Sequence, residues 1–165
     1  MKSHAIVLAQ LATLSRLKPG RFHFGVKGPK PPPGAVFLPT ARVNIVLSGR
    51  RRLTLPLAGK AADTILRAGD VQVSDRHNWE HLVCDEPHEV LCVVPRGEYL
   101  RVAYYRFRRE RDGSMVSESS SYHTPHPCSE PLRRTVDALC ACAHEPDGLV
   151  AGHLLRALIR LVVEA

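Results

Sequence analysis

Apolar and polar residues alternate along the first half of the chain with the period of two that is typical of half-buried β-strands. Within residues 42–47, Val43 and Ile45 alternate with polar side chains, and the leucines of residues 51–57 alternate in the same way. The Ser-Gly-Arg sequence at residues 48–50 separates the two runs. We therefore predict two strands joined by a turn.

Further short β-type runs follow, and each is bounded by glycine, proline or polar residues. A Gly-Asp pair at 69–70 predicts a turn, and residues 77–81, His-Asn-Trp-Glu-His, predict a loop that carries polar and aromatic groups. The additional strands predicted are residues 63–66, 71–74, 89–94, 99–108 and 115–120. Many short strands with such punctuation indicate a small β-barrel or sandwich.

The periodicity changes near both ends of the chain. Residues 5–17 have a loosely helical spacing of apolar side chains, and a Pro-Gly pair follows them. Two more helices are predicted after Ser129 and from Leu149 to the end. The last helix has a wider apolar arc than one core requires, which predicts that part of it contacts a second copy of the chain. The residues assigned to that dimer contact are Leu154, Leu155, Leu158, Ile159 and Val162. The alternative is burial within the chain's own domain.

These elements divide the sequence into three parts of one structural domain. Residues 1–34 hold the first helix, a short strand at 21–26 and a proline-rich segment at 28–34. That segment cannot enter a central sheet, so we expect an arm lying over the strands, with a linker as the alternative. Residues 35–122 form the β-rich part, and residues 123–165 form the helix pair.

Composition narrows the context of this fold. The 165 residues carry a net charge of +7, include five cysteines, and contain no apolar run long enough to cross a bilayer. An odd cysteine number without a secretion signal predicts reduced thiols in the cytoplasm. The positive charge suits an acidic partner, but the arginines are dispersed. We expect the Arg50-Arg51-Arg52 cluster to be a solvated edge that discourages sheet-to-sheet association.

The segment at 77–81 carries the candidate chemistry. Trp79 is expected to stack on a small ligand and His81 to donate a hydrogen bond to it, with Trp79 as a plain core residue as the alternative. The letters match H-x-x-E-H, but that zinc-protease motif requires a helix, which is not predicted here. A metal site formed by His77, His81 and His88 inside a barrel is a further alternative.

The pattern as a whole resembles the N-terminal cupin domain of AraC-type bacterial transcription regulators. The resemblance lies in Leu66-Arg67-Ala68-Gly69-Asp70-Val71 with the His/Trp segment after it, in the strand and turn at 42–49, in the strand at 99–107, and in the closing helix pair. It implies a mainly β fold with α elements. This would be a cupin-like, jelly-roll β-barrel followed by two helices, with a short helix at the N-terminus.

The same resemblance implies a function. In that family the cupin domain binds an effector, a sugar by default, and the helices form a homodimer, while a separate C-terminal helix-turn-helix domain binds DNA. We expect this chain to contact DNA only through such a domain, which the sequence does not contain, and to need no cofactor. By position, the pocket residues would be Trp79, His81, Asn44 and Tyr104.

Three functional hypotheses follow from the sequence. The favoured one is a cytoplasmic, non-enzymatic sensor and dimerisation domain of a transcription regulator. The second is a small metal-dependent cupin enzyme that uses His77 and His81. The third is a dimeric binding protein that acts alone.

Overall fold

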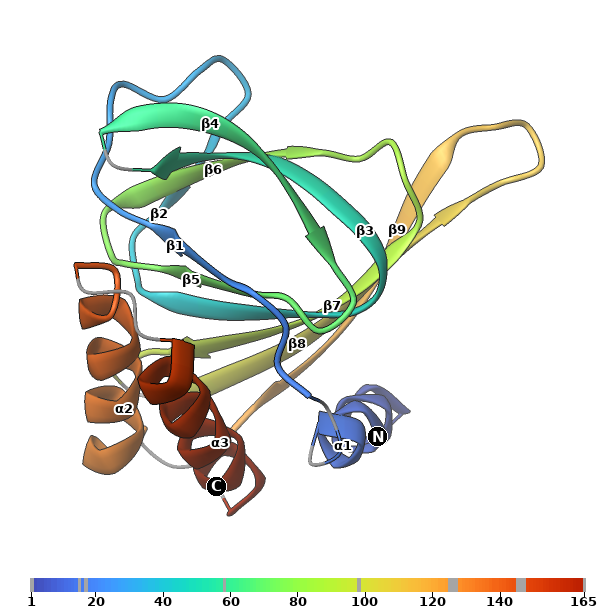
Figure 1. Cartoon of the computed structure of the whole chain (residues 1–165). Helices are drawn as coiled ribbons and strands as arrows, with labels where there is room; N and C mark the ends of the chain where they lie inside the picture. Colours follow the sequence, from blue (N-terminus) through green and yellow to red (C-terminus); the bar gives the residue numbers. More distant parts are fainter. Residues whose placement is uncertain are drawn as a thin grey trace.

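The chain folds into a mainly β structure with three helices (Figure 1). The computed structural model describes residues 2–14, 16, 18–57, 59–97, 99–124, 128–144 and 148–164. In chain order the elements are α1 (Lys2–Leu14), β1 (Phe22–Gly25), β2 (Val36–Leu38), β3 (Arg42–Leu57), β4 (Lys60–Arg67), β5 (Val71–Ser74), β6 (Asn78–Val83), β7 (His88–Pro95), β8 (Leu100–Arg109), β9 (Met115–His123), α2 (Glu130–Ala141) and α3 (Gly148–Glu164).

The nine strands form one mixed sheet with the main order β1-β5-β3-β7-β8-β9. Strands β4 and β6 pair with β3, and β2 pairs with β6. Only the β1–β5 pairing is parallel among the pairings of the described strands. The sheet curls so that β4 and β6 lie across from β5 and β7 (Figure 1). This curl gives the sheet an inner face and an outer face.

Strand β3 makes the curl, and here the prediction of a turn at 48–50 is wrong. The strand runs through these residues without reversing, with a register shift between Val46 and Ser48. Gly49 has φ +73°, and a Cβ there would lie 2.1 Å from the Pro87 carbonyl oxygen. A bulge with a glycine bends a strand without ending it. One half of β3 therefore pairs with β5 and β7, and the other half with β4 and β6.

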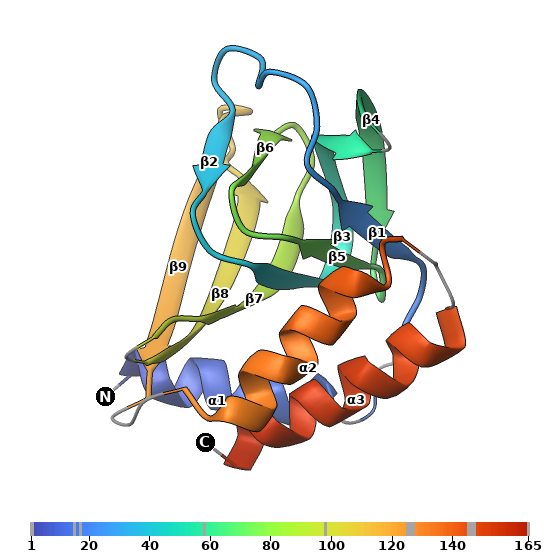
Figure 2. The same ribbon diagram turned by 90° about the vertical axis from the view of Figure 1, so that its left-hand side faces the viewer.

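The helices cover the outer face of the sheet (Figure 2). Alternate residues of the central strands point toward them, and the two sets form the main apolar core, while two smaller apolar clusters lie elsewhere in the sheet. From the strands, the core contains Val43, Ile45, Val71, Val73, Leu91, Val93 and Val102, and from the helices it contains Val7, Leu11, Leu132, Val136, Leu139, Leu155 and Leu158. The helical predictions are thus confirmed in type, although α1 begins earlier than predicted and Leu17 lies outside the described residues.

The N-terminal segment lies against the sheet, as the arm hypothesis predicts. The Val26 amide donates to the Pro56 carbonyl at 3.0 Å, and the Trp79 indole Nε1 donates to the Pro29 carbonyl at 2.9 Å. After the prolines, β2 pairs with β6. These contacts place residues 26–38 over one side of the strands.

The prediction of a loop at residues 77–81 is also wrong. Residues 78–83 form strand β6, which pairs with β2 on one side and with β3 on the other. The first half of β6 pairs with β2 and the second half with β3, and the side chains alternate between the two faces of the strand. That alternation separates Trp79 and His81 from Glu80 and decides which of them reach the interior.

Candidate functional site

A cavity of about 190 Å³ opens on the inner face of the curled sheet. It is bounded by side chains from β3, β6, β7 and β8, which the sheet brings together from distant parts of the chain. The lining residues are Arg42, Asn44, Arg51, Glu80, Leu82, Val90, Cys92, Tyr105 and Phe107. Polar and charged groups therefore mix with apolar ones around this cavity.

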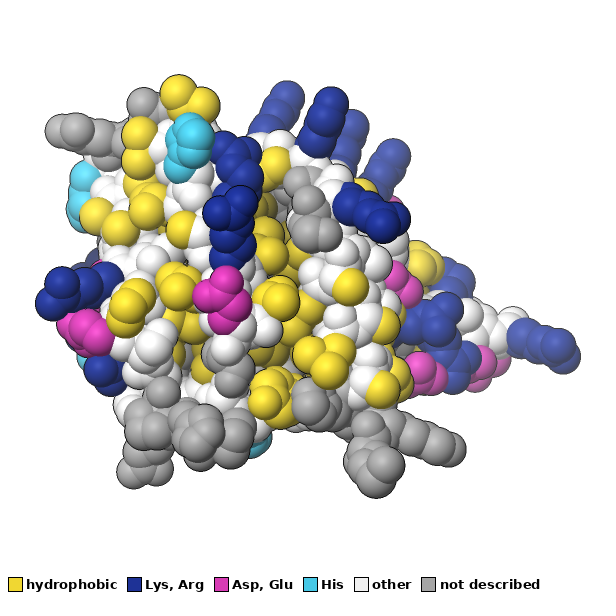
Figure 3. Space-filling view, turned by 90° about the horizontal axis from the view of Figure 1, so that it is seen from below, with side chains coloured by type: hydrophobic (Ala, Val, Ile, Leu, Met, Phe, Trp, Pro, Cys, Tyr) yellow, Lys and Arg dark blue, Asp and Glu magenta, His cyan; other side chains and the backbone are white. Residues whose placement is uncertain are grey.

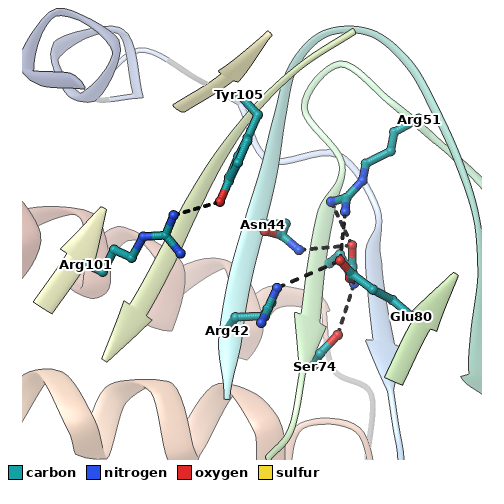
Figure 4. Close-up of polar contacts among 8 residues, drawn as sticks. Arg42, Asn44, Arg51, Ser74, Glu80, Arg101 and Tyr105 are labelled. Atoms are coloured by element: carbon teal, nitrogen blue, oxygen red, sulfur yellow. Dashed lines mark hydrogen bonds and ion pairs between the residues drawn. The ribbon is translucent and has the colours of Figure 1, made fainter. Parts of the chain in front are cut away.

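Gln72 on β5 is the centre of a polar network next to the cavity (Figure 4). Its side chain is completely buried. Its Oε1 accepts hydrogen bonds from Asn44 Nδ2 at 3.2 Å and from Arg51 Nη1 at 2.9 Å. Its Nε2 donates to Ser74 Oγ at 3.0 Å and to Glu80 Oε2 at 2.6 Å. All the hydrogen-bonding capacity of the amide is used, so the network fixes the side chains around it.

The network carries an excess of positive charge. Arg51 Nη2 lies 3.3 Å from Glu80 Oε1, and Arg42 Nη1 lies 3.9 Å from the same oxygen. Arg101 Nη2 donates to the Tyr105 hydroxyl at 3.1 Å. Two guanidinium groups therefore lie within 4 Å of the Glu80 carboxylate, and a third, that of Arg101, is bound to Tyr105. The residue Arg51 is only 5% exposed, so its charge is held away from water.

Burial keeps the thiol in the cavity lining neutral. Cys92 is fully enclosed, and this burial raises the pKa of its thiol to about 11. A thiol with this pKa carries no negative charge at neutral pH. Cys92 therefore does not balance the arginines.

Part of the cavity lining is apolar. Leu82, Val90 and Phe107 form this part, and the ring of Phe107 stacks on His88 with the centroids 4.3 Å apart. His88 Nδ1 lies 2.8 Å from the Glu86 carbonyl oxygen. Burial lowers the pKa of His88, so the neutral imidazole is favoured. The cavity lining accordingly combines cationic and apolar side chains.

Of the four predicted pocket residues, the structure brings Asn44 to the cavity. Asn44 is 2% exposed and lies opposite Gln72 and Cys92. Tyr104 points to the outer face of the sheet, where it packs against the apolar core. Its neighbour Tyr105 points to the inner face and lines the cavity. Burial, followed by a hydrogen bond to Glu89, raises the pKa of Tyr104 to about 12. The expectation that Tyr104 faces the interior is wrong.

Trp79 and His81 also face away from the cavity. Glu80 lines the cavity and strand side chains alternate, so Trp79 and His81 project to the other side of β6. Trp79 is 5% exposed under the proline-rich segment, with its indole bonded to Pro29. The structure therefore matches the alternative interpretation of Trp79 as a covered packing residue.

The three histidines of the metal alternative are not brought together. His77 is exposed, with φ +59°, beside the ring of Phe37. His81 lies on the outer side of β6, whereas His88 stacks on a cavity residue. Across the part of the chain that the structure describes, no group of three or more histidine, cysteine, aspartate or glutamate side chains is placed to hold a metal ion.

Sequence reasoning missed the charged half of the site. Arg51 belongs to the cluster that was expected to be a solvated edge, yet it is among the most buried polar residues. A signal was available, because Arg51, Leu53 and Leu55 alternate and share one face of β3. Gln72 and Glu80 occupy equivalent positions between apolar or aromatic neighbours.

The residues assigned to a dimer contact separate into two groups. Leu155, Leu158 and Val162 are at most 5% exposed and belong to the chain's own core, so for these three the prediction is wrong. The outer face of the sheet and the other helices already cover them. Leu154 and Ile159 are partly buried at the edge of that core and remain accessible.

No family model, no curated protein and no solved structure matches this chain. Among the described helices, none has both the length and the apolar content that crossing a bilayer requires.

Proposed function

We propose that this chain is an effector-sensing and dimerisation domain, in which the curled sheet is a cupin-like, jelly-roll β-barrel that binds a small molecule. One observation carries the proposal, namely the buried polar network around Gln72 beside a cavity on the inner face. Burying polar and charged groups costs stability that an apolar filling would not cost. A few convergent polar groups in a partly apolar cavity are typical of ligand sites.

The strand arrangement supports a relay from the cavity to the helices. Strand β5 carries Gln72 and Ser74 in the inner network and Val71 and Val73 in the core shared with the helices. A ligand that changes the position of β5 changes the surface on which α2 packs. Differential binding to two such arrangements is sufficient for a switch. As in AraC-type regulators, a separate helix-turn-helix domain would read that change on DNA.

We place this domain in the cytoplasm. All five cysteines are free thiols, and Cys84 is exposed. Exposed thiols persist in reducing compartments. The metal-dependent enzyme is the weaker hypothesis, because its proposed ligands are not brought together. His81 points away from the cavity on β6, whereas His88 on β7 stacks on the cavity residue Phe107.

The sensor part of the proposal is tested by filling the cavity. Cys92→Phe adds a ring at a lining position, whereas Cys84→Phe makes the same change at an exposed position. A panel of anionic and neutral small molecules is titrated while amide NMR shifts of β3 and β7 are followed. We expect Cys92→Phe to weaken binding of any responsive molecule by at least about tenfold and Cys84→Phe to leave it unchanged. Equal binding by both variants contradicts a ligand site in this cavity.

The dimer part rests on a stripe of α3 that keeps Leu154 from the predicted contact and adds Ala157 and Leu161. Leu154, Ala157 and Leu161 are spaced by three and four residues, so they share one side of the helix. Leu154 and Leu161 are half-buried and Ala157 is exposed. Apolar side chains on the helix-bearing side are visible between basic ones in Figure 3. A second copy of α3 would bury this stripe in the manner of a coiled-coil seam.

Light scattering tests the dimer directly. Ala157→Arg puts a charge into the stripe without touching the core, and Val163→Arg puts the same charge about 120° around the helix. Val163 is 58% exposed. We expect a dimer for the parent chain and for Val163→Arg, and a folded monomer for Ala157→Arg. A monomeric parent chain, or a dimeric Ala157→Arg, removes this interface from the proposal.

A further inference from the structure

The charges around the cavity point to the chemistry of its ligand. Arg42, Arg51 and Arg101 provide three permanent positive charges on the inner face, and Glu80 provides one negative charge. Guanidinium groups stay ionised at all physiological pH values. Arg51 is buried and pairs with Glu80, whereas the charges on Arg42 and Arg101 are only partly exposed and exceed what one carboxylate neutralises. A partly desolvated positive charge without a counter-ion favours the binding of an anion.

Two hydrogen-bond donors in this cluster also lack an acceptor. The Nε atoms of Arg42 and Arg51 are buried and have no hydrogen-bond partner within the described residues. Buried donors are nearly always paired in folded proteins. Both arginines line the cavity, so a group that enters it with oxygen acceptors meets them directly.

The rest of the lining limits the size and shape of that group. The cavity of about 190 Å³ has room for a small organic molecule. Leu82, Val90 and Phe107 line part of it and offer no hydrogen-bonding side-chain groups. A small inorganic anion would leave these apolar side chains without a partner, whereas a sugar would bury hydroxyl groups against them.

We propose that the ligand is a small organic carboxylate with a short apolar tail, its carboxylate held by Arg42 and Arg51 and its tail packed against Leu82, Val90 and Phe107. This inference rests on the proposed function, which supplies the ligand site, and adds the class of ligand. Arg–carboxylate pairing provides directional, charge-assisted hydrogen bonds. Arg101, through the Tyr105 hydroxyl, adds positive potential to the cavity lining.

The probe is butanoate, a carboxylate with a short apolar tail, and butanamide is its uncharged counterpart. Binding is measured by NMR titration to the parent chain and to Arg42→Gln, with Arg106→Gln as the matched control. Arg106 is an exposed arginine of β8 that pairs with Glu89 at 3.4 Å, away from the cavity lining. We expect Arg42→Gln to raise the butanoate Kd by about tenfold or more and Arg106→Gln to change it by less than about twofold. Butanamide should bind at least about tenfold more weakly than butanoate.

A second variant protects the test against misfolding of Arg42→Gln. Arg101→Gln leaves the Gln72 network intact and removes only the contact with Tyr105. It should raise the butanoate Kd by about threefold or more, with the circular dichroism spectrum unchanged. Butanoate binding that is insensitive to both variants overturns the inference.

Two further probes separate the failure of this inference from the failure of the proposed function. One outcome is that glucose or butanamide binds, that Cys92→Phe abolishes this binding, and that butanoate does not bind. In that case the cavity is a sensor site but the carboxylate assignment is wrong. If inorganic phosphate binds and butanoate does not, the site recognises a bare oxyanion and the apolar tail is wrong. If no probe binds at concentrations on the order of 10 mM, the carboxylate inference is wrong, and only the broader panel tested with Cys92→Phe bears on the sensor function.

Discussion

On strand β7, Leu91 and Val93 face the helices within a continuous apolar core, whereas Val90 and Cys92 face the cavity on the other side. The same contrast holds on β5, where Val71 and Val73 alternate with Gln72. The outer face gains stability from close packing. The inner face also has an apolar cluster around Leu53, Leu55 and Val90. Beside this cluster it buries polar groups that must be satisfied one by one, and these groups are better explained by recognition than by stability.

The largest effect should come from the outer face. Leu158 is 1% exposed within the core between α3 and the sheet. Leu158→Ala leaves a cavity there and should lower the free energy of unfolding by about 2–5 kcal/mol in urea titrations. Val163→Ala on the same helix, at an exposed position, should change it by less than about 0.5 kcal/mol. Similar losses for the two variants would mean that α3 is not part of the core.

An intermediate effect should come from the inner face. Gln72→Leu adds apolar surface but removes the partner of Asn44, Arg51 and Ser74. Unpaired buried groups should lower the free energy of unfolding by about 1–3 kcal/mol. Val73→Thr makes the reverse change, from apolar to polar, by placing a hydroxyl group in the apolar core of the outer face. It should also lower the free energy of unfolding. If Gln72→Leu is as stable as the parent chain, the two faces do not differ in the way described.

The smallest effect should be a dependence on pH at the apolar part of the cavity lining. His88 is 2% exposed, and burial lowers its pKa below 6.5 in the folded state. The neutral ring is therefore favoured by folding, and this contribution is complete above pH 6.5 and is lost as the pH falls through the lowered pKa. His88→Phe keeps a ring against Phe107 and removes the titration.

The measurement is the free energy of unfolding of both proteins between about pH 7.5 and about pH 5. The advantage of the parent chain over His88→Phe should shrink toward the acidic end. A difference that is constant with pH, or that grows on acidification, would contradict a neutral buried His88.

The local pattern of apolar and polar residues was sufficient to predict most of the strands and helices. Alternation predicted the strands that became β3, β7 and β8, and the change to helical spacing predicted α2 and α3. It failed at Gly49, where a glycine in a strand was interpreted as a turn although it forms a bulge. It also failed for β6, because the strand pairs through Trp79 with β2 and through His81 with β3, and both partner strands are distant in sequence.

The candidate site was harder to predict than the fold. Asn44 and Tyr104 were assigned to the interior by the same reasoning, and only Asn44 lies there. The difference is the register of β8, which sets Tyr105 opposite Val90 and Tyr104 opposite Leu91. A shift of one residue moves a side chain to the other face of a sheet. No local signal in residues 99–107 states which of two adjacent tyrosines faces inward.

The sequence by itself determined which residues share a face. Val43 and Ile45 form one set and Arg42 and Asn44 the other, because side chains along a strand alternate whatever surrounds them. The tertiary structure alone decided that the first set faces three helices and the second a cavity. That choice depends on the curl at Gly49 and on hydrogen bonds between distant strands. Because of these long-range contacts, Arg51 is buried next to the cavity, although the local sequence predicted a solvated surface charge.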